Sequence, residues 1–296
     1  MRTYLNCASC IIDDLCSALQ LAPLEEKIKK EILRDSFQFL AREFSTEKIP
    51  SYFITEVHRI LKRISGIEIP FKERRDKCNQ LGIEMTEKIA LEAGGLEESE
   101  RFSFLVNWAI ASNHLDFRTV GTGYGFQMAE IIEELRACVS EGLRIDQRVE
   151  IFQKAKSSSK VLYIHDNVGE IAFDKLLIKE LRRYGALVTS ALRGGPITSD
   201  ATMEDGETVG LQEAASKIIL AGPDTLGISL NEMTEQLKQE LQTADLVIAK
   251  GQANYYALTE HKSKAPGEIA CLFRTKCELV SNELGETGKI NVAILL

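Results

Sequence analysis

Apolar residues recur at helical spacing through the first half of the chain. Between Ile28 and Phe44 they fall every three or four positions, which predicts one helix with a buried stripe. The same spacing predicts further helices over residues 52–65, 72–93, 97–112 and 127–143, and glycine follows the first two of these. Because strand-like runs are nearly absent here, the pattern predicts an all-helical N-terminal domain over residues 1–156.

The pattern changes at Ser157-Ser158-Ser159. Beyond it, short apolar runs alternate with helical segments, as in repeated β-α-β units. The predicted strands span residues 161–164, 186–192, 246–249, 269–273 and 290–295, and the predicted helices span 170–184, 213–219, 232–243 and 277–284. This alternation predicts an α/β fold in which a mostly parallel, Rossmann-like sheet is flanked by helices. The second domain is therefore expected over residues 157–296.

Composition narrows the class of protein. The chain has 296 residues, of which 44% are apolar and 27% charged, enough for a globular core in one large or two ordinary domains. Its longest apolar runs fall well short of the roughly 20 residues that a membrane span needs, and the N-terminus lacks a hydrophobic signal, so we expect a cytoplasmic protein without membrane contact. Seven cysteines, an odd number, indicate reduced thiols. A net charge of -8 disfavours nucleic acid as a partner and leaves small anionic substrates open.

Polar residues follow three of the predicted strands at the point where each strand ends. Asp166 and Asn167 come directly after strand 161–164, and Asp200 lies in the loop after strand 186–192. Lys250 ends strand 246–249 and is followed by Gly251. Because the carboxyl ends of parallel strands share one edge of a sheet, we expect these residues to meet a ligand there.

Each of these residues also has a structural alternative. Asn167, with Glu170 three positions later, matches a capping box, and Asp200 could cap a helix that begins at Ala201. Neither alternative accounts for Asp166. A lysine at the end of a buried apolar strand is poorly explained as a solvated surface charge and well explained as an anion ligand.

The residue types favour a metal-assisted reaction on a phosphate. Carboxylate and amide oxygens are hard ligands that suit Mg²⁺ or Mn²⁺, so Asp166, Asn167 and Asp200 are the predicted metal ligands. Lys250, on the opposite side, would neutralise the charge on phosphate oxygens, as phosphoryl hydrolysis requires. Glu170 is a candidate acid or base beside them.

In combination, the motifs resemble those of the metal-dependent damage-control phosphatases, also called the domain-of-unknown-function-89 family. The matching segments are Asp166-Asn167-x-Gly169-Glu170 with Phe173-Asp174, the Pro196 to Asp200 loop, Lys250-Gly251-Gln252-x-Asn254, and Asn113-x-x-Asp116-Phe117. The resemblance implies hydrolysis of small phosphomonoesters, including sugar phosphates and damaged metabolites, with a divalent metal such as Mg²⁺, Mn²⁺, Ni²⁺ or Co²⁺. It implies that Asp166, Asn167 and Asp200 hold this metal. We further expect substrate contacts from Asn113, Asp116, Arg193, Lys250, Gly251 and Asn254, so that the helical domain contributes to the pocket of the metal- and phosphate-binding domain.

Two segments refine the resemblance. Cys7-x-x-Cys10 resembles the branch of the family with an N-terminal CxxC, which occurs in archaea and other microbes. The sugar-phosphate branch carries Arg-Thr-x-Lys, whereas Arg274-Thr275-Lys276-Cys277 places the lysine one position early. The resemblance therefore implies the family's reaction without assigning that branch's substrates.

Other interpretations stay open. A nucleotide- or S-adenosylmethionine-binding group-transfer enzyme, such as a methyltransferase, would use the same sheet but needs a glycine-rich first turn and an acidic residue ending the second strand. A non-catalytic scaffold would show no metal dependence. The glycines between Gly121 and Gly125 are a weak phosphate signal and favour a connector, because no strand precedes them. Cys7 and Cys10 would need a further cysteine, Cys78, Cys271 or Cys277, to hold zinc, and buried reduced thiols are the alternative.

Overall fold

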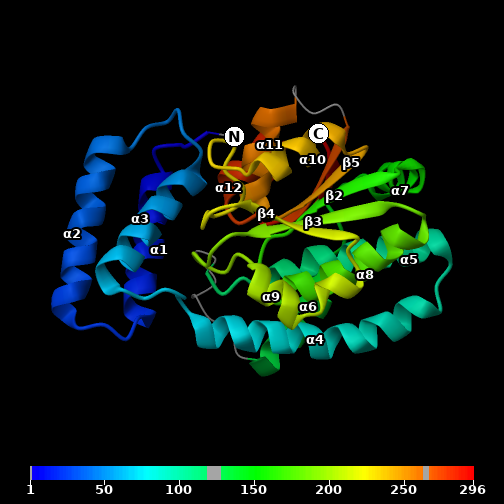
Figure 1. Ribbon diagram of the computed structural model, residues 1–296, viewed down its shortest axis with the longest axis horizontal. Coiled ribbons are helices and arrows are strands. Elements are labelled where there is room, and N and C mark those ends of the chain that lie inside the picture. Colours follow the sequence, from blue (N-terminus) through cyan, green and yellow to red (C-terminus); the bar gives the residue numbers. More distant parts are fainter. Residues whose placement is uncertain (1, 119–127, 263–266) are drawn as a thin grey trace.

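The computed structural model describes residues 2–118, 128–262 and 267–296 (Figure 1). The predicted glycine-rich connector, Gly121 to Gly125, lies outside the described residues. None of the described helices is both long enough and apolar enough to cross a membrane.

One sheet of seven strands forms the centre of the described chain, in the order β1-β7-β6-β5-β2-β3-β4. Neighbouring strands run parallel except for β6 and β7, which pair antiparallel. The strands are β1 (Ile145–Asp146), β2 (Lys160–Ile164), β3 (Leu187–Arg193), β4 (Lys217–Gly222), β5 (Leu246–Lys250), β6 (Glu268–Arg274) and β7 (Asn291–Leu295). The predicted fold class, a mostly parallel sheet flanked by helices and preceded by a helical region, is confirmed.

Helices cover both faces of this sheet (Figure 1). A single hydrophobic cluster joins one face to α4 (Lys72–Gly94), α5 (Glu98–Ala111), α6 (Met128–Glu141), α7 (Arg148–Ser157) and α8 (Glu170–Arg183). Within it, α5, α7 and α8 contact the strands, α4 packs mainly on α8, and α6 packs on α5. The other face packs against α10 (Glu235–Thr243), α11 (Gln252–His261) and α12 (Glu278–Glu283). The short elements are α9 (Met203–Thr208) and the 3₁₀ helices η1 (Ser112–Leu115) and η2 (Leu211–Glu213).

The first three helices form a separate layer at one end of the molecule (Figure 1). They are α1 (Cys7–Leu21), α2 (Glu26–Glu43) and α3 (Pro50–Ser65), and they bury a hydrophobic cluster of their own around Leu15, Phe53 and Val57. Helices α4 to α7 instead share the hydrophobic cluster that includes one face of the sheet. The boundary near residue 156 stays a prediction, and the hydrophobic clusters group α4 to α7 with the sheet.

The predicted helix over residues 213–219 is wrong. The segment is split between η2 and the edge strand β4, in which Ile219 and Ala221 are buried while Leu220 is 40% exposed. Alternating burial of this kind is typical of a strand, and a short apolar run cannot be assigned by periodicity alone. The sequence also did not predict β1 inside the helical half, or α11, which begins at Gln252 where a loop was expected.

Candidate active site

The predicted site residues lie where the strand order of the sheet reverses. From β2 the chain continues to β3 and β4 on one side, and then to β5 and β6 on the other. In open α/β sheets, ligands bind outside the carboxyl ends of the strands at such a switch point. Asp166 and Asn167 follow β2, and Lys250 and Gly251 end the adjacent strand β5.

Asp166 is 3% exposed and lies against the backbone of β5. Its Oδ2 accepts hydrogen bonds from Asn113 Nδ2 at 3.2 Å and from Asn167 Nδ2 at 2.8 Å. Gly251 has a φ of +79°, and a Cβ added there would lie 1.8 Å from Asp166 Oδ2. Only glycine therefore allows the carboxylate to occupy this position.

The Asn167 side chain joins the loops after β2 and β3. Its Nδ2 also donates to Glu170 Oε2 at 3.0 Å, its Oδ1 faces the Ser199 hydroxyl at 2.9 Å, and its backbone forms an isolated bridge with Asp200. Helix α8 begins at Glu170 with Gly169 at its N-cap, so the Asn167 side chain does not cap the helix. The amide oxygen thus points toward the second loop of the predicted metal site.

Asp200 is fully buried and held by donors from two loops. Its Oδ2 accepts from Arg193 Nε at 2.9 Å and from the Gly227 amide at 2.8 Å, and its Oδ1 accepts from Thr198 Oγ1 at 3.2 Å. Helix α9 begins at Met203 and not at Ala201, so Asp200 does not cap it.

Arg193 and Asn254, both predicted to contact substrate, are buried beside Asp200. Arg193 Nη2 donates to Asn254 Oδ1 at 3.1 Å and to the His165 carbonyl at 3.2 Å. Asn254 also accepts from the Ile228 amide at 2.8 Å and donates to the carbonyls of His165 and Lys250. These contacts orient the loops around Asp200.

Lys250 has no exposed side-chain surface, and its ammonium contacts three acceptors of the protein. It donates to Glu170 Oε1, to Asp174 Oδ1 at 2.9 Å and to the Ala109 carbonyl at 2.7 Å. Burial alone would lower the pKa of Lys250, but Asp174 and Glu170 outweigh burial and raise it, so the ammonium stays charged. Because an ammonium has three N–H bonds, contact with a phosphate would require Lys250 to give up one of these partners.

Lys276 was not among the predicted site residues, and it reaches the site from the end of β6. Its ammonium pairs with Asp116 Oδ2, and its side chain is 26% exposed. Asp116 Oδ1 lies 2.5 Å from the Ser199 hydroxyl, which connects Lys276 to Asn167. The Arg274-Thr275-Lys276 element, compared above with the Arg-Thr-x-Lys of the sugar-phosphate branch, is the sequence signal that could have identified Lys276.

The carboxylates give this site an excess of negative charge. Burial raises the pKa of Asp166 well above its usual value, and Glu170, Asp200 and Asp116 raise it further while Lys276 opposes them. A bound cation would stabilise the ionised form. The donors are two carboxylates and the Asn167 amide oxygen, a hard set that fits a divalent cation. The described residues contain no group of three His, Cys, Asp or Glu side chains that could hold a metal.

The N-terminal thiols Cys7 and Cys10 lie on α1. Burial raises the pKa of Cys7, and the thiols of Cys10 and Cys277 raise it further. Of the three further cysteines considered from the sequence, Cys277 is therefore the one that interacts with Cys7. Cys78 and Cys271 are instead buried in the clusters on the two faces of the sheet. The raised pKa values of Cys7, Cys10, Cys78 and Cys271 keep these four thiols protonated and weaken them as metal ligands or nucleophiles.

We expect the double variant Cys7→Ser with Cys10→Ser to retain turnover within about threefold, well under the tenfold that corresponds to ~1.4 kcal/mol of lost transition-state stabilisation. The reason is that hard oxygen donors suffice for the predicted cation. Phosphate release per folded molecule measures the effect. A folded double variant that loses turnover together with its bound metal would contradict the oxygen-only site.

Comparisons with known proteins agree with this architecture. A family model described as the damage-control phosphatase ARMT1-like domain matches residues 3–290. The chain is 32% identical to an uncharacterized protein of Methanocaldococcus jannaschii, over 98% of this chain and 94% of that protein. It is also 32% identical to a damage-control phosphatase of Archaeoglobus fulgidus, over 94% of each. A crystal structure of a DUF89 family protein from Pyrococcus horikoshii superposes with a TM-score of 0.87 at 29% identity and covers 99% of both chains.

Proposed function

We propose that this chain, which belongs to the damage-control phosphatase ARMT1-like family, hydrolyses small phosphomonoesters with the help of a divalent cation. The observation that carries this proposal is the pairing of a buried, electron-rich oxygen set around Asp166 with a partly exposed lysine, Lys276, at the switch point of the sheet. Such a pairing suits a cation on one side of a phosphate and an ammonium on the other. Assignment to the CxxC branch stays a prediction.

Asp166, Asn167 and Asp200 would hold the cation. The excess negative charge around Asp166 supports this choice, and the hard oxygen donors favour Mg²⁺, Mn²⁺, Ni²⁺ or Co²⁺ over a thiolate-bound metal. When bound, the cation would supply Lewis-acid polarisation of a phosphoryl oxygen.

Lys276 is proposed to bind the phosphate, a role that was predicted for Lys250 from its position at the end of a strand. Within the described residues its ammonium contacts one acceptor, Asp116, so N–H groups remain for phosphate oxygens. Burial alone would lower the pKa of Lys276, but Asp116 and Asp166 outweigh burial and raise it, so the charge is retained. Lys250 instead fixes Glu170, which orients the amides of Asn113 and Asn167 toward the site.

The group-transfer alternative needs a different first turn. A nucleotide-binding sheet places glycines and a helix N-terminus at a pyrophosphate. Here the turn after β2 carries Asp166 and the buried Glu170, two acidic groups that would repel a phosphate without a cation between them. The proposal is therefore hydrolysis of a small phosphorylated metabolite, in the cytoplasm, without nucleic acid or membrane as a partner.

The direct test is a screen for phosphate release. Sugar, nucleotide and cofactor phosphomonoesters are incubated with the protein, with chelator alone and with each of the four divalent metals. We expect release from at least one class of substrate, dependent on the metal and abolished by chelation. Absence of release in every combination, or release that persists in chelator, would refute the proposal.

Lys276→Met should lower turnover by about 10²-fold or more, the scale of losing one charged group that stabilises a transition state. Metal affinity should be retained or slightly raised, because Lys276 lies close enough to Asp166 to act on its charge. Calorimetric titration with Mn²⁺ and initial rates of phosphate release separate the two effects. The exposed Lys289 provides the control, since Lys289→Met should leave both quantities unchanged. If Lys276→Met loses metal affinity but turns over normally at saturating metal, Lys276 acts on the metal and not on the phosphate.

A further inference from the structure

Two loops hold Asp200 from opposite sides. The loop after β3 contributes the Thr198 hydroxyl, 3.2 Å from Asp200 Oδ1, and the loop after β4 contributes the Gly227 amide, 2.8 Å from Asp200 Oδ2. The position of the Asp200 carboxylate therefore depends on how these two loops are placed relative to each other.

Both loops are fastened to the N-terminal layer by one helix, α3. Lys62 Nζ donates to the Pro196 carbonyl at 2.9 Å in the first loop and to Asp224 Oδ2 at 2.7 Å in the second. Arg59 Nε donates to the other oxygen of Asp224 at 3.1 Å. Thr55 also contacts the second loop, because its Oγ1 accepts a hydrogen bond from the Leu226 amide at 3.0 Å.

These three residues lie on one face of α3. Thr55, Arg59 and Lys62 are spaced by four and three positions, which places them one above another along a helix. Lys62 contacts both loops, because its ammonium donates to a carbonyl of one and to a carboxylate of the other.

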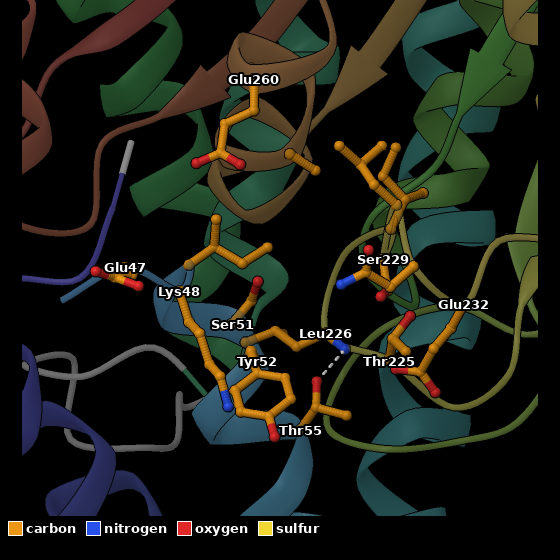
Figure 2. Close-up of a pocket in the computed structure, with 15 residues that line it drawn as sticks. Glu47, Lys48, Ser51, Tyr52, Thr55, Thr225, Leu226, Ser229, Glu232 and Glu260 are labelled. Atoms are coloured by element: carbon orange, nitrogen blue, oxygen red, sulfur yellow. Dashed lines mark hydrogen bonds between the residues drawn. The ribbon is translucent and has the colours of Figure 1, made fainter. Parts of the chain in front are cut away.

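The loop after β4 borders a cleft on one side. Residues 225–232 border a cleft of about 240 Å³ whose opposite wall includes Ser51, Tyr52 and Thr55 of α3. Figure 2 shows Thr55 and Leu226 joined by a hydrogen bond across this cleft. With a cavity along part of its length, the loop relies on its polar contacts to α3 for a fixed position.

We propose that Lys62 is a positioning residue: by holding both loops that donate to Asp200, it lets the N-terminal helices α1 to α3 set how tightly the site binds its divalent cation. The claim about cation affinity rests on the proposed function, whereas the claim that Lys62 fixes the two loops rests on geometry alone. Lys62 is 20% exposed and its partner Asp224 is 21% exposed, so replacing either leaves no fully buried charge unpaired.

The first experiment compares Mn²⁺ affinity by calorimetry in the full chain. Removing a group that orients a metal ligand commonly weakens metal binding by about 10- to 100-fold. Lys62 acts through one further link, so we expect Lys62→Met to weaken Mn²⁺ binding by about 3- to 10-fold, with kcat recovered at saturating Mn²⁺. Lys62→Arg, which keeps the charge and the donors, should restore most of the affinity. The neighbouring Arg63, 65% exposed and paired with Asp35 of α2, supplies the control Arg63→Met, which should bind as the wild type does.

The second experiment needs no metal. Hydrogen exchange of the backbone amides, followed in peptides covering residues 194–200 and 223–228, should be at least about threefold faster in Lys62→Met than in Arg63→Met. Asp224→Asn, which weakens the same ion pair from its other side, should accelerate exchange in the same peptides.

The outcomes separate the inference from the proposed function. If wild-type protein binds no Mn²⁺, the proposed function fails, and exchange alone decides whether Lys62 holds the loops: faster exchange supports it and unchanged exchange overturns it. If wild type binds Mn²⁺ and folded Lys62→Met binds it equally well, the inference is overturned while the proposed function stands.

Discussion

Asp166→Asn is expected to abolish phosphate release while the protein remains folded. The substitution keeps the size of the side chain and its hydrogen bonds to Asn113 and Asn167 but removes the charge that the cation requires. Metal ions supply several kcal/mol of transition-state stabilisation, and each ~1.4 kcal/mol is a factor of ten, so turnover should fall by about 10³-fold or more. Initial rates, with circular dichroism as the check on folding, measure the effect.

The same variant should change how the stability of the metal-free protein depends on pH. The pKa of Asp166 is raised well above the ~3.9 expected in the unfolded chain. Its contribution to stability is therefore fully present below pH ~3.9 and is lost as pH rises through the folded pKa. Because Asn cannot ionise, urea unfolding in chelator should show wild type losing stability relative to Asp166→Asn as pH rises from about 4 toward neutrality.

The control for this variant is Asp245→Asn. Asp245 lies at the opposite, amino-terminal edge of the sheet, where its carboxylate accepts the amides of Ser159 and Lys160. Its replacement should spare phosphate release. Normal metal-dependent turnover in Asp166→Asn would exclude Asp166 as a metal ligand.

The position of the candidate site could be predicted because it follows from strand order and local pattern. An apolar run that ends in Asp166 and Asn167 predicts a strand end, and the repeated alternation of strand and helix predicts that such ends gather at one edge. Both expectations depend on residues close in sequence. The confirmed strands β2, β3 and β5 and the meeting of their loops needed no knowledge of distant contacts.

What could not be predicted depends on which distant groups meet. The segment around Ile219 has too few residues for its period to separate helix from strand, and only pairing with β3 makes it an edge strand. Nor does the sequence around Lys62 reveal that it touches Pro196 and Asp224, more than 130 residues away. Contacts of this kind become visible only when the chain is folded.

Lys250 shows that a local argument can establish the need for an anion without identifying the anion. A lysine at the end of a buried strand does require an anion, because an unpaired buried charge is very costly. The sequence argument took that anion to be the phosphate. The folded chain supplies two anions of its own, Glu170 and Asp174, on the first turns of α8.

Lys250→Met is therefore expected to damage the fold before it affects the chemistry. Removing one partner of a buried ion pair typically costs about 3–5 kcal/mol, because the remaining charge is left uncompensated. Urea unfolding should show a loss of this size, whereas Lys276→Met should lose less stability, because it removes the partner of one buried carboxylate, Asp116, and not of two.

The pH dependence and a second substitution identify the cause of that loss. Burial alone would raise the pKa of Asp174, but Lys250 and His165 outweigh it and the pKa is lowered. The ionised Asp174 thus contributes stability above the unfolded pKa of ~3.9, and this contribution disappears as pH falls through the folded value. Lys250→Met removes the main source of that contribution, so the difference in unfolding free energy between wild type and variant should be largest near neutral pH and shrink in acid.

Adding Asp174→Asn to Lys250→Met removes one of the two carboxylates left without their lysine partner and should recover part of the lost stability. If Lys250→Met instead unfolds like wild type and raises KM for the phosphomonoester, the ammonium contacts the substrate, and the assignment of phosphate binding to Lys276 is wrong.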